Sequence, residues 1–122
     1  MPATPNHPLL TPEKSKVLVE GRLSAEFDDL ASEADRIHPR YARFINTIRS
    51  LGETGGKRLR PYMAMLAFEA YSGQPGERIL PMAVSLELLH FSMLIHDDVI
   101  DRDDTRYGKP NVTAQYLSLI HI

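Results

Sequence analysis

The sequence predicts an all-α protein whose helices pack roughly antiparallel across short loops. Two observations favour this class. Apolar residues recur at alternating spacings of four and three over residues 23–37, and a second amphipathic stripe follows over residues 41–51, which is typical of helices. No segment alternates between apolar and polar residues for long enough to predict a confident strand. We therefore expect an antiparallel helical bundle.

The first predicted helix follows an arm over residues 1–10, which holds three prolines and which we expect to be disordered. Thr11 is a suitable N-cap because Pro12 then occupies the first helical position. We expect the helix to end near His38, because Pro39 disfavours the α conformation in the residue before it. Its apolar stripe consists of Leu23, Phe27, Leu30, Ala34 and Ile37.

The second and third predicted helices flank a basic, glycine-rich connector, "GETGGKRLRP" at residues 52–61. We expect the second helix to end at Gly52 and the third to open at Pro61. The sequence "SGQPGE" closes the third helix. The two apolar stripes are Tyr41, Phe44, Ile45, Ile48 and Leu51, then Tyr62, Met65, Leu66, Phe68 and Tyr71.

The fourth predicted helix runs from about Ile79 to Asp101 and is apolar on nearly all sides, so we expect it to be central. Its apolar run is long enough to span a bilayer. Titratable residues interrupt the run, and they favour a helix buried in protein over a transmembrane segment. These residues are Glu87, His90, His96, Asp97 and Asp98.

Composition limits the classes of protein and partner. The 122 residues suffice for one small domain, and a net charge of −2 provides no global field to recruit nucleic acid. The absence of cysteine excludes a disulfide scaffold and any cysteine-based zinc site. The stretch "MPATPNHPLL" lacks a basic region followed by an apolar core, so we expect no signal peptide and a cytoplasmic protein.

Carboxylates concentrate at the end of the fourth helix, in "DDVID" at residues 97–101. In a regular helix His90, Asp97 and Asp101 fall roughly within 40° of one another, and the two aspartates are about 6 Å apart along the axis. Such carboxylates repel, and Mg²⁺ would compensate because it binds one or two carboxylates together with substrate phosphates. The alternative is a solvated acidic helix end.

Other metal-site patterns fit the acidic segment less well. An EF-hand requires a loop glycine, which is absent, and a bidentate glutamate where Val112 stands. A histidine-aspartate phosphohydrolase would begin from His96 and Asp97, but no second histidine pair is placed to complete its metal site.

The stretch "GGKRLRP" at residues 55–61 is the cationic counterpart, with Lys57, Arg58 and Arg60 beside two glycines. Glycine lets the backbone approach a ligand, and these cations suit diphosphate oxygens. A P-loop is excluded because Leu51 stands at its first glycine position. A solvated basic turn remains the alternative reading.

Two further residues have open interpretations. His90 shares the face of Asp97 and could donate to a phosphate, although a lone helix histidine is more often a satisfied core residue. Lys109 in "RYGKP" could be only a turn charge.

Two segments, "GGKRLRP" at 55–61 and "ELLHFSMLIHDDVIDRDDTRYGKPN" at 87–111, resemble the N-terminal half of the trans-isoprenyl diphosphate synthases, the polyprenyl synthetase family. "DDVID" matches that family's first aspartate-rich motif, D-D-x-x-D. The resemblance covers about residues 10–116. It implies the N-terminal part of the isoprenoid synthase fold, with a partial polyprenyl synthetase domain over residues 11–116.

The resemblance also implies an activity in isoprenoid biosynthesis. A magnesium-dependent trans-prenyltransferase (polyprenyl diphosphate synthase) would condense isopentenyl diphosphate with an allylic diphosphate to give a longer trans-polyprenyl diphosphate. The expected partners are these two substrates and, in the full-length form, a second copy of the chain. Neither nucleic acid nor a transmembrane segment is expected.

The same resemblance implies residue roles. Asp97 and Asp101 would bind Mg²⁺ on the allylic diphosphate, with Asp98 beside them as a third metal residue. The catalytic set would be Asp97, Asp101 and Lys57. The substrate contacts would be Arg106 to the allylic diphosphate and Lys57, Arg60 and His90 to isopentenyl diphosphate.

Three departures from the family pattern affect these expectations. Tyr107 stands where the family usually has a second arginine, so one cationic contact is in question. Ser92 is small where a bulky aromatic residue caps short products, which predicts a geranylgeranyl or longer product. Met93 or Phe91 could partly close the product tunnel.

The third departure is the ending "LSLIHI" at residues 117–122, which does not resemble the family's continuation. No second aspartate-rich motif occurs, so we expect a truncated domain, a tail outside the family and a chain inactive on its own. A non-catalytic helical partner subunit of a prenyl diphosphate synthase remains an alternative. A further alternative is an aberrant fragment that dimerises or aggregates through its apolar helix.

Overall fold

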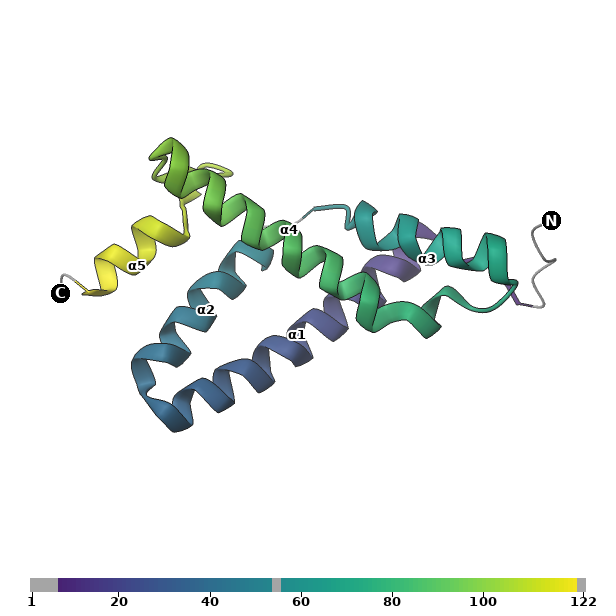
Figure 1. The fold of residues 1–122 in the computed structure, drawn as a ribbon, viewed down its shortest axis with the longest axis horizontal. Helices are drawn as coiled ribbons and strands as arrows, with labels where there is room; N and C mark the ends of the chain where they lie inside the picture. Colours follow the sequence, from purple (N-terminus) through teal and green to yellow (C-terminus); the bar gives the residue numbers. More distant parts are fainter. Residues whose placement is uncertain (1–6, 54–55, 121–122) are drawn as a thin grey trace. The chain divides into compact units, whose positions relative to one another are not determined.

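The computed structural model describes residues 7–53 and 56–120, with side chains up to residue 117, and these residues are largely helical (Figure 1). The all-α prediction is therefore confirmed. The chain forms two compact units, Met1–Ala25 with Gly56–Leu88 and Glu26–Gly55 with Leu89–Ile122. The elements are α1 (Pro12–Ile37), α2 (Pro39–Glu53), α3 (Leu59–Ser72), the 3₁₀ helix η1 (Gly76–Ile79), α4 (Leu80–Asp101), β1 (Thr105–Arg106), β2 (Lys109–Pro110) and α5 (Val112–Ile120).

Local signals place several helix ends where the sequence predicts them. The backbone N–H of Lys14 donates to Thr11 Oγ1 at 3.2 Å, which confirms the N-cap of α1. The helix ends one residue before His38, and α2 begins at Pro39. Gly73 caps α3 in the left-handed conformation, with φ at 70°.

Two predicted boundaries shift because of tertiary contacts and backbone conformation. The third helix begins at Leu59, two residues before the predicted Pro61, because Arg58 adopts a left-handed conformation and ends the connector there. Pro61 is tolerated in the first turn, where a backbone N–H has no helical acceptor. The second helix continues one residue past the predicted Gly52, which is buried with the Phe91 ring 3.0 Å from where a Cβ would stand.

The first unit is held by a buried carboxylate as well as by apolar packing. Glu69 accepts hydrogen bonds from the backbone N–H groups of Leu10 at 3.0 Å and Gly76 at 2.9 Å. The hydroxyl of Tyr62 donates to the Leu10 carbonyl oxygen at 3.2 Å. The last residue of the predicted arm is thus fixed, while residues 1–6 lie outside the described part. The buried apolar residues of this unit are Leu10, Val19, Leu23, Met65, Ala83 and Val84.

The second unit packs α2 against α5. The rings of Phe44 and Tyr116 meet edge to face, with centroids 5.1 Å apart. A salt bridge of 2.6 Å joins Arg49 on α2 to Asp28 on α1. The buried apolar residues of this unit are Phe27, Leu51, Phe91 and Val112.

Helix α4 is more exposed than the sequence predicts. Several of its apolar side chains are more than half exposed within the described chain, whereas a central helix would bury them. The segment Gly76–Asp101 is long and apolar enough to cross a bilayer, although a core helix of a soluble protein passes the same test. The expected absence of a transmembrane segment stays a prediction. The exposed residues are Met82, Leu89, Met93, Val99 and Ile100.

Replacing Gly76 with alanine tests the close packing of η1 against α3. A Cβ at Gly76 would lie 2.7 Å from the Met65 carbonyl oxygen, so we expect the free energy of unfolding to fall by about 1–3 kcal/mol. The matched control is Gly21→Ala in the same unit, where a Cβ meets nothing within 4 Å. It should gain about 0.5–1 kcal/mol from helix propensity. Urea unfolding of both variants is the measurement, and equal effects would contradict the packing argument.

Candidate functional site

The aspartate-rich segment forms the last turn of α4, which is regular up to Asp101. Asp97 and Asp101 are exposed to solvent one turn apart, whereas Asp98 is buried with 4% of its surface exposed. His90 is half-buried on the same helix. Two carboxylates of the segment are therefore open to a ligand, and the third points into the protein.

The buried Asp98 forms a bidentate ion pair with Arg106. The Nε–H of Arg106 donates to Asp98 Oδ2 at 3.0 Å, and Nη2 donates to Oδ1 at 2.7 Å. The exposed fractions of the two side chains are 5% for Asp98 and 23% for Arg106. The hydrogen bond to Asp98 raises the pKa of Arg106 above its ordinary value, although burial acts in the opposite direction. The guanidinium therefore keeps its charge at all physiological pH values.

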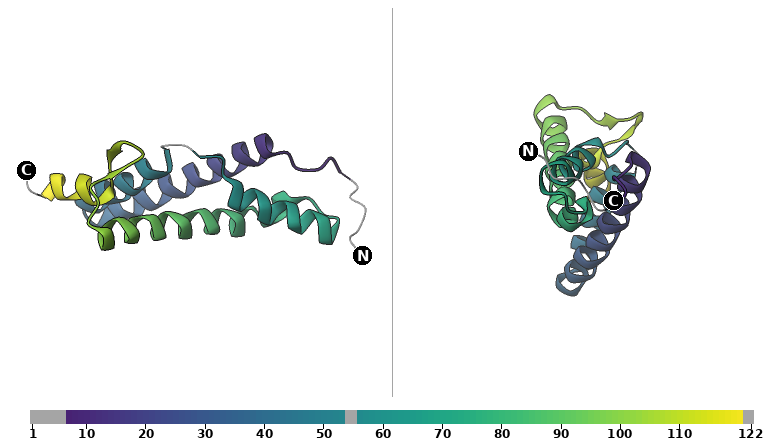
Figure 2. Two further views of the ribbon diagram at one scale, coloured as in Figure 1. Left: turned by 90° about the horizontal axis from the view of Figure 1, so that it is seen from above. Right: turned by 90° about the vertical axis from the view of Figure 1, so that its right-hand side faces the viewer.

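A tight hairpin follows α4 (Figures 1 and 2). It carries Arg106, which bonds back to Asp98 on that helix. The chain leaves α4 through Arg102, which is left-handed with φ at 57°, and the Asp103 N–H bonds to the Asp98 carbonyl oxygen at 3.0 Å. The turn between β1 and β2 has positive φ at Tyr107 and Gly108, an arrangement suited to two-residue hairpins. The antiparallel register pairs Arg106 with Lys109.

Asn111 joins this hairpin to α5. The residue is buried, its Nδ2 donates to the Asp103 carbonyl oxygen at 2.7 Å, and its N–H donates to the Asp104 carbonyl oxygen at 2.9 Å. Its Oδ1 accepts from the Ala114 N–H at 2.9 Å, which caps the N-terminus of α5. The loop after the aspartate-rich segment is thus fixed at both ends by polar contacts.

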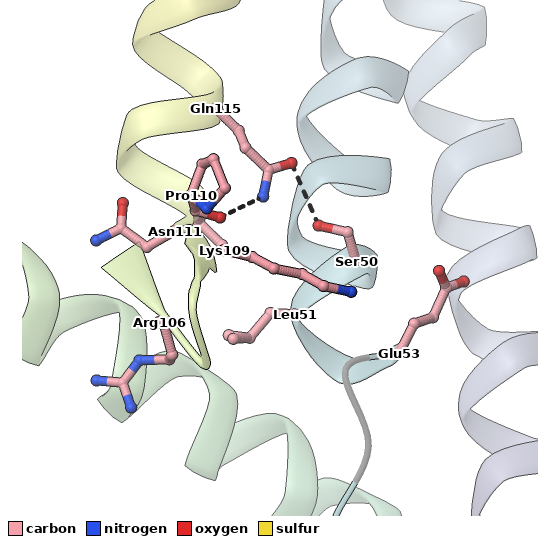
Figure 3. A pocket seen from close by; sticks show the side chains of 9 residues that line it. Ser50, Leu51, Glu53, Arg106, Lys109, Pro110, Asn111 and Gln115 are labelled. Atoms are coloured by element: carbon pink, nitrogen blue, oxygen red, sulfur yellow. Dashed lines mark hydrogen bonds between the residues drawn. The ribbon is translucent and has the colours of Figure 1, made fainter. Parts of the chain in front are cut away.

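A cavity of about 440 Å³ lies within the second unit, between the hairpin and the C-terminal end of α2. Figure 3 shows the Lys109 side chain reaching from the hairpin towards α2, and Gln115 bonded to Ser50 and to the Pro110 carbonyl oxygen. Cations and amide donors of this kind suit an anionic oxygen. The lining residues are Ser50, Leu51, Glu53, Arg106, Lys109, Pro110, Asn111, Val112 and Gln115.

Residues 56–61, the part of the basic connector that lies in the first unit, divide their cations between two environments. Lys57 and Arg60 are exposed, whereas the Arg58 side chain is only 6% exposed. Arg58 Nη1 lies 3.2 Å from Glu87 Oε2, and its Nε lies 3.5 Å from Glu20 Oε1. Arg58 therefore fixes the connector, and its two neighbours remain accessible to a ligand.

The structure brings together only some of the predicted site residues. Asp98 and Arg106 are in direct contact, and with His90, Asp97 and Asp101 they belong to the second unit. Lys57 and Arg60 belong to the first unit. A shared cleft for two diphosphates stays a prediction.

The described residues fit a divalent cation only in an open arrangement. Within residues 7–53 and 56–120, no three histidine, aspartate or glutamate side chains are grouped as metal ligands. The exposed Asp97 and Asp101 nevertheless supply two carboxylates on one face, which suits an ion that keeps several waters and binds substrate phosphates. The prediction that these residues and Asp98 bind metal remains untested.

The sequence did not predict the roles of three residues that shape the site. Glu87 is the buried partner of Arg58, Lys109 lines the cavity rather than serving only as a turn charge, and Asn111 caps α5. Asn111 could have been found, because an asparagine directly before an apolar run is a usual N-cap signal. The contacts of Glu87 and Lys109 depend on tertiary structure and leave no local signal.

Comparison with known proteins gives a consistent match. The family model described as "Polyprenyl synthetase" matches residues 42–119. The chain is 50% identical over 68 residues to geranylgeranyl diphosphate synthase of Methanosarcina mazei, covering 56% of this chain and 21% of that protein. It is 42% identical over 94 residues to heptaprenyl diphosphate synthase component 2 of Geobacillus stearothermophilus, covering 73% and 29%.

A third relative is geranylfarnesyl diphosphate synthase of Aeropyrum pernix, 43% identical over 65 residues, covering 52% of this chain and 20% of that protein. The chain thus spans between 20% and 29% of the length of these three relatives. No solved structure matches the chain significantly.

The Arg58–Glu87 pair provides a test of how the connector is fixed. Glu87→Ala removes the buried carboxylate that lies 3.2 Å from the buried guanidinium of Arg58, so we expect the free energy of unfolding to fall by about 3–5 kcal/mol. The double variant Arg58→Met with Glu87→Leu should lose less, because neither charge is then buried alone. Glu77→Ala, at an exposed position of the same unit, is the control. The single variants Arg58→Met and Glu87→Leu complete the cycle, and urea unfolding would refute the assignment if the double variant lost the sum of their two losses.

Proposed function

This chain belongs to the polyprenyl synthetase family, and from that premise we propose that it forms part of a trans-prenyltransferase. The reaction is the condensation of isopentenyl diphosphate with an allylic diphosphate. The observation that carries the proposal is the end of α4, where Asp97 and Asp101 face solvent beside the Asp98–Arg106 pair. Carboxylates that can hold a cation and a fixed guanidinium are the groups that diphosphate chemistry requires.

Asp97 and Asp101 would hold Mg²⁺ through their exposed carboxylates. Bound there, the ion would neutralise charge that develops on the departing pyrophosphate. Arg106 would bind oxygens of the same allylic diphosphate through its planar, forked donors. The apolar residues of α4 would keep water from the allylic cation that forms when the carbon–oxygen bond breaks.

Lys57, Arg60 and His90 would hold isopentenyl diphosphate. The support is that Lys57 and Arg60 are exposed while Arg58 between them fixes the connector. The double bond of isopentenyl diphosphate would then attack the cation, and a proton would leave.

The proposed product is geranylgeranyl diphosphate or longer. Ser92 is a small, exposed residue on α4, so it leaves room beside the aspartate-rich turn for a growing chain. Two relatives are named geranylgeranyl and geranylfarnesyl diphosphate synthase, which agrees with a longer product.

A second candidate function is that of a partner subunit. The relative named heptaprenyl diphosphate synthase component 2 is one component of such a synthase, and it matches 73% of this chain. Assembly as a homodimer, a cytoplasmic location, the absence of nucleic-acid partners and inactivity of the 122-residue chain on its own all stay predictions.

Replacing the exposed aspartates tests the metal assignment. In Asp97→Ala or Asp101→Ala, we expect kcat/KM for chain elongation to fall roughly 100-fold, because charge on the leaving pyrophosphate is less well stabilised. The measurement is incorporation of labelled isopentenyl diphosphate onto farnesyl diphosphate. It is made on this chain and on the longest protein that its gene encodes. Asp104→Ala, at an exposed position outside the motif, is the matched control.

The outcomes of this assay separate the two candidate functions. Near-normal rates in both aspartate variants would remove the metal assignment. The wild-type forms could instead show no turnover alone and gain turnover when a second synthase component is added. That result would favour the partner subunit.

Replacing the exposed cations of the basic connector tests the proposed binding of isopentenyl diphosphate. Lys57→Ala and Arg60→Ala should each raise KM for isopentenyl diphosphate roughly tenfold, because each removes a charge-assisted hydrogen bond. The KM for the allylic substrate should change much less. Lys14→Ala, an exposed cation on α1 in the same unit, is the control for loss of charge alone. Equal changes in both KM values would argue against a dedicated isopentenyl diphosphate site.

A further inference from the structure

We propose that Asp98 is a positioning residue that holds Arg106 and the β1–β2 hairpin in place for diphosphate binding. This inference deepens the proposed function and rests on it for the identity of the ligand. A role for Asp98 as a third metal residue is the competing outcome of the experiment.

The oxygen atoms of Asp98 are already engaged. Oδ2 accepts from Arg106 Nε at 3.0 Å, and Oδ1 accepts from Arg106 Nη2 at 2.7 Å. With 4% of the residue exposed, little space remains for a cation that usually keeps several waters. Asp97 and Asp101 are both exposed, so the three aspartates divide into two open carboxylates and one internal anchor.

The ion pair fixes the plane of the Arg106 guanidinium. Two of its five N–H groups are directed at Asp98 in the forked geometry that matches a carboxylate. The side chain remains 23% exposed and lines the cavity, so its other edge is accessible to an anion. Asp98 therefore holds the remaining N–H donors of Arg106 in a fixed orientation.

The hairpin that carries Arg106 needs such an anchor. Each strand has only two residues, and a short isolated hairpin is marginally stable in water. Arg102 and Tyr107 have positive φ without being glycine, a conformation that side chains with a Cβ disfavour. Since Arg106 pairs with Lys109 across the hairpin and both line the cavity, a single buried carboxylate places two cations.

A double-mutant cycle on Asp98→Asn and Arg106→Gln tests the proposal. Binding of Mn²⁺ alone and of inorganic pyrophosphate with Mn²⁺ is measured by calorimetry on the full chain. In Asp98→Asn we expect Mn²⁺ affinity to change less than about twofold, and pyrophosphate affinity to fall about tenfold through loss of charge-assisted bonds. The double variant should bind pyrophosphate no more weakly than Arg106→Gln, because Asp98 acts through Arg106.

Matched aspartate variants identify the metal ligands. Asp97→Asn and Asp101→Asn should each lower Mn²⁺ affinity at least about tenfold, because each removes an exposed carboxylate ligand. A comparable loss in Asp98→Asn, also with Arg106→Gln present, would overturn the proposal in favour of a metal ligand. Lower thermal stability of Asp98→Asn with unchanged pyrophosphate affinity would overturn it in favour of a purely structural role.

A measurement on the wild-type chain covers the case in which Asp98→Asn does not fold. The Nε–H signal of Arg106, assigned by its loss in Arg106→Gln, is followed by ¹⁵N NMR during titration with Mg²⁺ and pyrophosphate. We expect it to stay protected from exchange, because the bond to Asp98 persists. Loss of that protection on adding Mg²⁺ alone would show that the metal takes Asp98 and would overturn the proposal.

These measurements do not depend on turnover. A wild-type protein that shows the expected cycle but forms no product would contradict the proposed function and leave the role of Asp98 supported. Product formation together with additive effects of the two substitutions would contradict only the role of Asp98. Failure of the wild-type protein to bind either probe would contradict both.

Discussion

The candidate site depends on the buried ion pair between Asp98 and Arg106. Successive residues of an α-helix point about 100° apart, so adjacent aspartates at a helix end cannot face the same environment. Asp97 faces solvent and Asp98 faces the protein interior, where a carboxylate is stable only when it is paired. The doubled aspartate therefore provides one open carboxylate and one anchor from two identical side chains.

The basic connector of the first unit shows the same division of roles. Arg58 is buried against Glu87, and the neighbouring cations Lys57 and Arg60 are exposed. In each unit a buried pair fixes the backbone, so the exposed charges beside it lose less conformational entropy when a ligand binds. Three of the buried charged residues of the described chain, Arg58, Glu87 and Asp98, accordingly lie in the two segments with the strongest functional signals.

The sequence predicted the elements whose ends depend on local chemistry. The break at His38 and the cap at Gly73 follow from proline and glycine conformations, and the acidic face of α4 follows from helix periodicity. The partner of Asp98 was not predictable, because it lies beyond a loop in which Arg102 and Tyr107 adopt left-handed conformations that non-glycine residues rarely choose. The exposed apolar side chains of α4 were missed because composition predicts burial without specifying what covers the helix.

The charge balance of this site explains why a cation would be needed despite Arg106. Over residues 97–109, five aspartates against Arg102, Arg106 and Lys109 leave a net charge of −2, and the charge of Arg106 is largely offset by Asp98 at 2.7 Å. A diphosphate approaching Asp97 and Asp101 would be repelled, and the repulsion would grow as apolar surroundings excluded water. A divalent cation between the carboxylates and the diphosphate reverses that interaction. Arg106 would then orient the diphosphate through directional hydrogen bonds more than attract it by charge. A planar guanidinium held in one position can do this.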